Sequence, residues 1–447
     1  MANREPSLVE LDRLATLGED VLKRCRAKGA SEVDLGISVD EGLDVGVRLG
    51  EVESIVRTRD RGLTLTVYFG KRKGSASTAD LSADSIAKTI DHACAIARHT
   101  EEDPCNGLAD PALLAREFPD LDLWHPWDID ATQAIELALE CEEAGRAFDA
   151  RIDNSEGANV QVASSVSVGM TSHGFISRER DTRHTISLAL LAEDEAGMQR
   201  DYWYESVRAA GDFPAIASIG RKAAERTLAR LGARPIGTRQ CPVLFAPTAA
   251  RSLIGHFLSA VSGGALYRRA SFLLDHLGRR VFPDFVQIAE RPHLRRGHGS
   301  SVFDAEGVAT RDSDLVRDGI LERYILGSYS ARKLGMTSTG NAGGVHNILV
   351  MPGEHGFDAL VERMGSGLVV TELMGQGVSL ITGDYSRGAS GFWVENGRIA
   401  HPVEEITIAS NLRDMFEAIE AVGNDVDRRS HLLTGSILVG RMTVAGS

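Results

Sequence analysis

Residues 367–397 read GLVVTELMGQGVSLITGDYSRGASGFWVENG, a series of short β-prone runs separated by glycine. The runs 367–373, 378–382 and 391–395 are rich in β-branched and aromatic side chains, which favour strands. The pair Asn396-Gly397 lies between two such runs, and Asn-Gly in that setting predicts a two-residue hairpin turn. We therefore expect the C-terminal half of the chain to be a glycine-rich antiparallel β-sheet or a barrel-like domain.

The residues from about 239 to 366 show the same pattern of short β-prone runs separated by glycine. A strand is predicted over 241–246 and a helix over 249–261, which contains His256. Further short β-prone runs follow, at 302–303, 319–326 and 405–409. Ala233-Arg234-Pro235 and Gly237 interrupt the preceding helical pattern, so we place a boundary there. The predicted domains are 1–235 and 236–447.

The N-terminal half has a different pattern, in which helical and alternating segments follow one another. Val33 to Val39 and Leu43 to Leu49 alternate as two strands, with Glu41-Gly42 as the turn between them. Two more strands are predicted within 55–69, broken at Arg61-Gly62. The other elements expected from periodicity are helices over 8–22, 86–97, 131–148 and 216–231, and strands over 160–170 and 185–192. Helices packed on an antiparallel sheet make an α+β fold class.

Composition narrows the possible partners and the compartment. The 447 residues carry a net charge of −14, which argues against nucleic-acid binding through a basic face. The five cysteines are scattered without a C-x-x-C pair, as is typical of reduced thiols in the cytoplasm. Neither a secretory signal nor a run long enough to span a membrane is evident. We expect a cytoplasmic protein that binds neither nucleic acid nor membrane.

Common catalytic motifs are missing from the sequence. No histidine is followed by glutamate as a zinc-peptidase helix requires, and the serine-hydrolase elbow G-x-S-x-G and the P-loop are both absent. Gly365-Ser366-Gly367 does not continue as a dinucleotide fingerprint. Ser330 and Lys333 match S-x-x-K, but the S-D-N and K-T-G motifs that accompany it in β-lactamases are absent. No catalytic residue and no metal ligand is assigned from these patterns.

Three stretches nevertheless have the composition of a binding site: 337–347, 367–377 and 383–392. The first combines glycines with amide side chains and a histidine, which predicts unusual backbone angles and exposed peptide groups. Such a loop suits an extended peptide or an anion, and a tight structural loop explains it equally well. The third places charged, aromatic and hydroxyl side chains among glycines, a reasonable lining for a pocket.

These motifs also carry a resemblance to a known family. The segments 328–347 (SYSARKLGMTSTGNAGGVHN), 367–397 and 402–416 (PVEEITIASNLRDMF) look like the TldD/PmbA family, specifically its PmbA (TldE) branch, and 263–281 fits that branch too. The resemblance implies a cytoplasmic metallopeptidase of two related subunits. The TldD subunit carries an H-E-x-x-x-H helix with the metal, and the complex encloses a chamber that trims unfolded peptides. The older family label, modulator of DNA gyrase, sits poorly with the acidity of this chain.

The chain departs from the family's metal motif. The metal helix of the TldD subunit should correspond to about 253–264, where Ile254, Gly255 and Ser259 occupy the positions of the ligands and the general base. His256 is out of register. The usual three zinc ligands are therefore missing. The resemblance implies no cofactor in this chain, with zinc expected in a TldD-type partner.

Our leading hypothesis is a non-metal-binding, TldE-like subunit that pairs with a TldD-type subunit and binds unfolded peptide substrates by strand addition. The first alternative is a standalone homodimeric peptide-binding protein without peptidase activity. The second is an independent enzyme that uses His346 or the Ser330/Lys333 pair. The residues expected to line the chamber and bind substrate are Asn341, Gly343, Gly344, His346, Thr371, Glu372, Gln376, Asp384, Tyr385 and Ser386.

Overall fold

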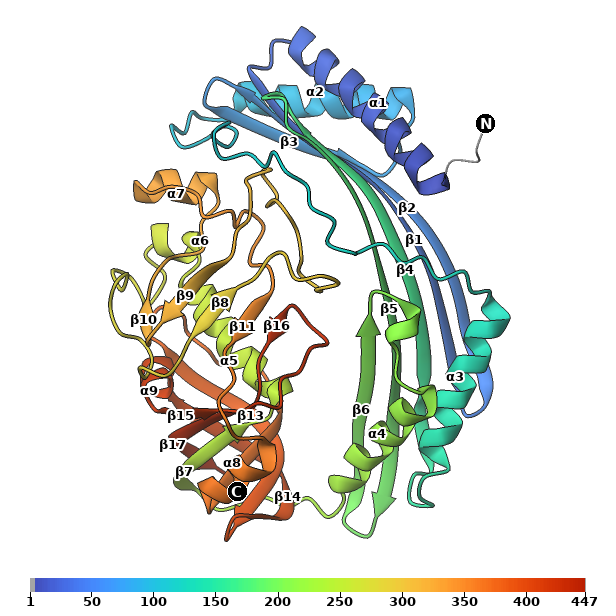
Figure 1. Cartoon of the computed structure of the whole chain (residues 1–447), viewed down its shortest axis with the longest axis vertical. Helices are drawn as coiled ribbons and strands as arrows, with labels where there is room; N and C mark the ends of the chain where they lie inside the picture. The colour runs from blue at the N-terminus through green and yellow to red at the C-terminus, as the bar shows by residue number, and fades with distance from the viewer. Residues whose placement is uncertain (1–4, 447) are drawn as a thin grey trace.

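A long antiparallel sheet forms the N-terminal half of the molecule (Figure 1). The computed structural model describes residues 5–446. The strand order is β3-β2-β1-β4-β5-β6, and every neighbouring pair is antiparallel. The bounds are β1 Glu32–Arg48, β2 Glu51–Phe69, β3 Arg72–Thr78, β4 Asn154–Thr171, β5 Ile176–Asp194 and β6 Gly197–Val207.

The first two strands are longer than the sequence pattern predicted. The turn expected at Glu41-Gly42 is wrong, because β1 continues through it with Glu41 paired to Arg59 and Ser164. The break expected at Arg61-Gly62 is wrong as well. The buried residues of β1 keep one phase from Val33 to Val47, so a single strand satisfies both apolar runs. Glu41 is exposed because it falls between the two apolar clusters that the helices cover.

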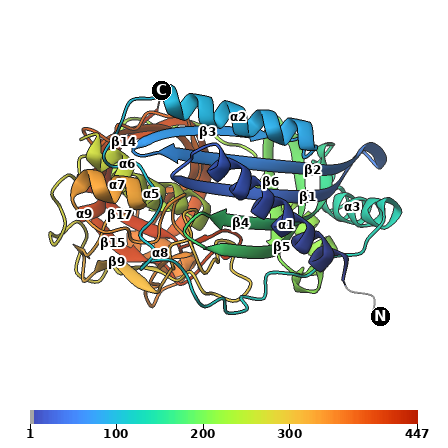
Figure 2. The same cartoon turned by 90° about the horizontal axis from the view of Figure 1, so that it is seen from above.

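Four helices cover the convex face of this sheet in two pairs (Figures 1 and 2). The helices α1 (Pro6–Ala27) and α2 (Ala83–His99) bury one end of β1, from Val33 to Val39. At the other end α3 (Ala131–Arg146) and α4 (Ile216–Ala229) pack on each other and on the residues from Leu43 to Val47. The Asp130 capping box fixes the start of α3. This half confirms the α+β fold class.

The C-terminal half is built around a closed barrel of five strands. Its strands follow the order β14-β13-β12-β7-β17, and β14 pairs with β17 to close it. Asn396 and Gly397 both have positive φ, 52° and 73°, and make the predicted hairpin turn between β13 and β14. The strand predicted over 378–382 is instead a loop. The bounds are β7 Arg239–Phe245, β12 Gly367–Met374, β13 Asp384–Glu395, β14 Arg398–Asn411 and β17 Ile437–Ala445, with β15 (Ile419–Val422) beside β17.

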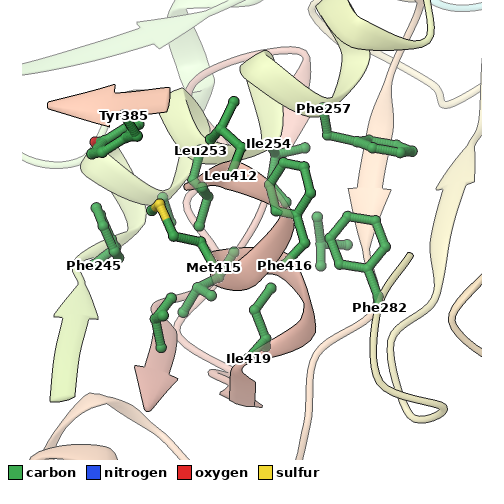
Figure 3. Packing of buried hydrophobic residues seen from close by; sticks show 14 of the residues in the cluster. Phe245, Leu253, Ile254, Phe257, Phe282, Tyr385, Leu412, Met415, Phe416 and Ile419 are labelled. Carbon is green, nitrogen blue, oxygen red and sulfur yellow. The ribbon is translucent and has the colours of Figure 1, made fainter. Parts of the chain in front are cut away.

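A smaller sheet lies beside the barrel, in the order β10-β9-β8-β11-β16. The helix α5 (Pro247–Ala260) and the short helix α9 (Leu412–Glu417) join the two through a single apolar cluster. Figure 3 shows Tyr385 and Phe245 on one side of this cluster and Phe257, Phe282 and Phe416 on the other. The remaining bounds are β8 Ile288–Glu290, β9 Ser313–Arg317, β10 Ile320–Leu321, β11 Ile348–Val350, β16 Leu432–Leu433, α6 Gly263–Tyr267, α7 Ser328–Leu334, α8 Phe357–Met364 and the 3-10 turn Ala210–Asp212.

The concave face of the long sheet turns toward the barrel half (Figure 1). Small and hydroxyl side chains dominate this face of β1 and β4, as in the pairs Gly36–Gly169 and Ser38–Ser167. The loop 303–307 docks on one end of it, where Phe303 packs on Phe175 at 5.2 Å between ring centroids. Among the helices of residues 5–446, none is long and apolar enough to cross a membrane.

The barrel depends on a close approach between β12 and β13. A Cβ atom added at Gly391 would lie 1.9 Å from the carbonyl oxygen of Val369. We expect Gly391→Ala to lower the free energy of unfolding by about 2–4 kcal/mol, because the strands must separate to admit the methyl group. The measurement is the thermal unfolding midpoint.

Gly255→Ala is the matched control for that change. Gly255 lies inside α5, and an added Cβ would meet nothing within 4 Å. Alanine there should stabilise the helix by about 0.5–1 kcal/mol. Equal midpoints for the two variants would show that the approach at Gly391 is not tight.

A second prediction concerns Asp34, which faces Glu306 across a groove of about 330 Å³. Burial and then the charge of Glu306 raise the pKa of Asp34 to about 6. In the unfolded chain Asp34 ionises at its ordinary pKa, about 4. The ionised carboxylate therefore lowers the free energy of unfolding progressively as pH rises from about 4 to about 6, and by a constant amount above that. Asp34→Asn should therefore raise the unfolding midpoint by a few degrees near pH 8 and change it little near pH 4.

Asp40→Asn is the control for this prediction, since Asp40 lies on the same face of β1 and is exposed. Loss of stability in Asp34→Asn at the higher pH would mean that the carboxylate has a partner in solution and is not strained.

Candidate functional site

A buried carboxylate, Glu290, organises the first predicted binding loop. Asn341 donates to Glu290 from Nδ2 at 2.9 Å, and the backbone N–H of His346 donates to Glu290 Oε1 at 2.7 Å. The Nδ1 atom of His346 lies 3.0 Å from the same oxygen. Arg323 forms an ion pair with Glu290 and also donates to Asn341 Oδ1 at 2.9 Å. The side chain of Glu290 is only 3% exposed, so these partners surround it.

The partners of Glu290 keep it charged. Burial by itself would raise the pKa of Glu290, but the hydrogen bonds from His346 and the charge of Arg323 outweigh burial and hold that pKa below its ordinary value. Because Asn341 and His346 both donate to this carboxylate, Glu290 holds the loop 341–346 in place. The contact between Glu290 and Nδ1 of His346 also fixes the orientation of the imidazole. Among these contacts His346 has no second acidic or basic group with which it could exchange a proton.

The glycines of this loop have the backbone that the sequence suggested. Gly343 and Gly344 have φ of 89° and 131°, a region that side chains disfavour. The N–H of Gly344 closes a turn onto the carbonyl of Asn341 at 3.1 Å. Next to them, Asp304 Oδ2 accepts from the N–H of Ala342 at 2.8 Å. The loop is therefore held by buried carboxylates on two sides.

The S-x-x-K pair lies on α7 but does not form a catalytic dyad. Ser330 donates to the carbonyl of Gly327 at 3.1 Å, and Lys333 forms an ion pair with Asp103 at 2.9 Å. The hydrogen bond to Asp103 raises the pKa of Lys333, so its ammonium group stays protonated near neutral pH and is not available to take a proton from Ser330. Within residues 5–446 no hydrogen bond joins Ser330 to Lys333.

The helix α5 occupies the position where the family resemblance expects a metal. Ile254 is 1% exposed and packs in the apolar core, while Ser259 donates back to the carbonyl of Gly255 at 2.8 Å. His256 lies with its ring edge-on to Tyr385, 5.9 Å between centroids, and its Nε2 is buried without a partner. In the described part of the chain no three His, Cys, Asp or Glu side chains are grouped so that they could hold a metal ion. The residues present do not fit zinc.

Beside α5 the strand β12 has an open edge. On one side β12 pairs with β13 along its length, with a bulge between Val370 and Glu372. On the other side its parallel partner β7 ends at Phe245, opposite Val370, and the chain turns into α5. The segment 371–374 therefore extends past β7 with no strand on that side among residues 5–446. An unpaired strand edge is a template for another strand.

A pocket of about 280 Å³ lies at this open edge, between the barrel and β6 of the long sheet. The first turn of α5, the aromatic side chains of β6 and three arginines surround it. Its lining residues are Asp201, Tyr202, Trp203, Tyr204, Arg226, Thr248, Ala249, Ser252, Thr371, Glu372, Leu373, Arg387 and Arg429. Two of the predicted substrate-binding residues, Thr371 and Glu372, thus share one pocket.

Glu372 is tied to the N-terminal half by an ion pair across the pocket wall. Arg230 of α4's C-cap donates to Glu372 Oε2 at 2.6 Å, and Ser390 donates to the same oxygen at 3.1 Å. Burial alone would raise the pKa of Glu372, but Arg230 and Ser390 hold it below its ordinary value. Glu372 is therefore an anion that fixes α4 to the barrel.

The other four predicted residues lie around the loop that replaces the expected strand. Gln376, Asp384 and Ser386 are exposed, and Asp384 accepts from Thr382 Oγ1 at 2.6 Å. Tyr385 is 2% exposed and packs against α5 (Figure 3). Burial raises the pKa of its phenol to about 12. The ten residues thus fall into three sets: the Glu290 loop, the pocket edge and this loop. Their substrate-binding role stays a prediction.

Sequence reasoning overlooked several residues that shape these sites. Glu290 ends the apolar run at β8, and a single carboxylate closing a buried strand was a detectable signal. Arg387 lies inside a stretch already singled out, 383–392. Asp201 and Arg230 had no signal, because their partners Arg226 and Glu372 lie 25 and 142 positions away. The contact of Arg429 with Tyr204 joins residues 225 positions apart.

Comparison with known proteins places the chain among peptidase relatives. It is 48% identical to the metalloprotease PmbA of Escherichia coli O157:H7, over 94% of each chain. It is 21% identical to a metalloprotease TldD homolog of Haemophilus influenzae, over 82% of this chain and 80% of that one. A crystal structure from Bacteroides thetaiotaomicron, described as a putative modulator of DNA gyrase, matches with a TM-score of 0.92 and 26% identity, covering 98% of this chain and 99% of that one.

A further structural match is TldE from Thermococcus kodakarensis, with a TM-score of 0.84 and 18% identity over 96% of this chain and all of that one, which shows the shared fold. Three domain families of the PmbA/TldA metallopeptidases match in order: domain 1 at 33–97, the central domain at 124–231 and the C-terminal domain at 238–446. The chain therefore belongs to the PmbA/TldD metallopeptidase family, on its PmbA branch.

Proposed function

We propose that this chain is the non-metal-binding, TldE-like subunit of a cytoplasmic TldD/TldE-type metallopeptidase that degrades or processes unfolded peptides. In this assembly a TldD-type subunit supplies the zinc, and this chain supplies part of the chamber and of the substrate-binding surface. The observation that carries the proposal is α5, where the residues at the expected ligand positions are Ile254, Gly255 and Ser259.

The open edge of β12 supports a role in substrate binding. A peptide that pairs with the segment 371–374 would use backbone N–H and C=O groups, which every sequence offers. Strand addition also requires an extended chain, so it selects unfolded peptides over folded ones. The turn of the chain into α5 after Phe245 leaves this edge unpaired.

The concave face of the long sheet supports a role as a chamber wall. Its small side chains leave two grooves, of about 330 and 490 Å³, along β1 and β4. About half of the residues that line them are glycine, serine, threonine or aspartate, and the large apolar residues include Phe175 and Phe303 at one end. Such a wall admits polar peptide backbone without offering a specific apolar pocket.

Mixing the chain with a cognate TldD-type subunit is expected to give a heterodimer that co-purifies and cleaves an unfolded peptide faster than the TldD-type subunit alone. A chelator should abolish that cleavage, because the metal is in the partner. Elemental analysis should find zinc in the heterodimer and less than stoichiometric zinc in this chain. Failure to co-purify together with no effect on cleavage would contradict the proposal, as would stoichiometric zinc in the isolated chain.

Hydrogen exchange tests the open edge directly. Binding of an unfolded peptide to the heterodimer should slow amide exchange within 371–374, because those N–H groups gain acceptors, and should leave the hairpin at Asn396-Gly397 unchanged. A peptide N-methylated at alternate residues is the matched control and should bind more weakly, since it cannot complete the strand pairing. Protection that maps only outside β12 would place the peptide elsewhere.

A further inference from the structure

The charged groups around the pocket at the β12 edge pair with one another in a specific way. Asp201 accepts from Arg226 at 3.1 Å, and Glu372 accepts from Arg230 at 2.6 Å. Asp427 forms ion pairs with Arg429 at 2.7 Å and with Arg251. Each carboxylate of this cluster is therefore already engaged by at least one arginine.

Arg387 is the exception. Its Nη1 donates to Ser252 Oγ at 2.8 Å, and its Nε is buried without a partner. Among the ion pairs of residues 5–446, none includes Arg387. Burial, and next the charge of Arg387, lower the pKa of neighbouring His256, which favours its neutral form, so that imidazole does not compete for an anion as a cation. Arg387 also lies beside the phenol of Tyr385, a neutral neighbour that does not balance its charge. A partly buried guanidinium without a carboxylate beside it favours an anionic partner.

The residues that line the pocket restrict the kind of molecule that can carry this anionic group. The indole of Trp203 stacks on Arg429, 3.6 Å from the guanidinium carbon to the ring centroid, and so forms a rigid side. Ala249 and Leu373 add apolar surface beside it. The first turn of α5 has no side-chain cap, so its N-terminal dipole also favours negative charge. The pocket therefore offers a cation, an apolar wall and an open strand edge within one small volume.

We propose that this pocket binds the terminal carboxylate of the substrate peptide through Arg387. The inference rests on the proposed peptide-binding function and deepens it by naming the group that is recognised. A peptide paired with 371–374 of β12 runs beside the pocket, so its last residue can place its carboxylate on Arg387 and its side chain against Trp203. Planar carboxylate and planar guanidinium match as a two-bond pair.

The test uses the purified full chain and a fluorescent unstructured peptide in two forms, a free C-terminal acid and a C-terminal amide. Fluorescence anisotropy should show that wild type binds the acid about tenfold or more tightly than the amide, as expected for a charge-assisted pair. Arg387→Gln should bind the acid as weakly as the amide, and Arg387→Lys should keep part of the preference. Arg221→Gln, an exposed arginine of α4 outside the pocket, is the matched control.

Ser252→Ala provides a second variant that keeps the charge but removes the hydroxyl that positions Arg387, and it should lower the preference less than Arg387→Gln. A peptide with an internal aspartate and an amidated end separates a terminal carboxylate from an acidic side chain, and tight binding of that peptide would contradict the assignment. Equal affinities of the acid and the amide for wild type, no binding of either, or a preference that survives in Arg387→Gln would overturn it.

Cleavage by the heterodimer with a TldD-type subunit separates this inference from the proposed function. Cleavage that is equally fast for acid and amide peptides contradicts only the role of Arg387. A carboxylate preference in binding without any effect on the partner's cleavage contradicts only the proposed function.

Discussion

The parallel pairing of β7 with β12 covers only three residues of each strand, Val243 to Phe245 and Leu368 to Val370. The unpaired edge of β12 and the pocket beside it depend on where that pairing stops. Because the chain leaves β7 at Phe245 and enters α5, the helix packs on the barrel core while β12 continues with a free edge. The same turn places the uncapped first residues of α5 at the mouth of the pocket. The end of β7 thus determines where α5 begins, which part of β12 is unpaired and where the pocket lies.

The two halves of the molecule are joined at this point by charge. Arg230 of the N-terminal half reaches Glu372 on β12, and Arg429 reaches the carbonyl of Tyr204 on β6 at 2.9 Å. Removing either partner of the Arg230–Glu372 pair would leave a partly buried charge uncompensated, which favours keeping the two side chains together. These contacts join the walls of the pocket, and among residues 5–446 Arg387 is the pocket's arginine without a carboxylate partner. The Glu290 network does a different task, because it rigidifies the loop 341–346 from inside.

Much of the fold could be predicted from local patterns. The Asn396-Gly397 turn, the helices 131–148 and 216–231, and the change of texture near residue 236 follow from hydrophobic periodicity and turn chemistry. Two of the errors place a turn inside a strand that continues through it. Glu41-Gly42 is an acceptable turn in isolation, but it lies inside β1, whose buried residues stay in phase on either side. Arg61-Gly62 lies inside β2, which continues because it pairs with β1 along its length. The prediction of a strand over 378–382 is wrong, because Gly377 and Gly383 at its two ends allow the backbone to form a loop.

The sequence by itself determined the α+β class, the glycine-rich barrel half, the family resemblance and the absence of a zinc helix motif, since each of these is written in local spacing or residue identity. Only the tertiary structure decided that the barrel closes and that, within the described residues, β12 has an unpaired edge and Arg387 lacks a carboxylate while its neighbours Arg226, Arg230 and Arg429 have one. Several of these features depend on residues that are far apart in sequence, such as Arg230 with Glu372 and β7 with β12, and no local pattern encodes which distant residues meet.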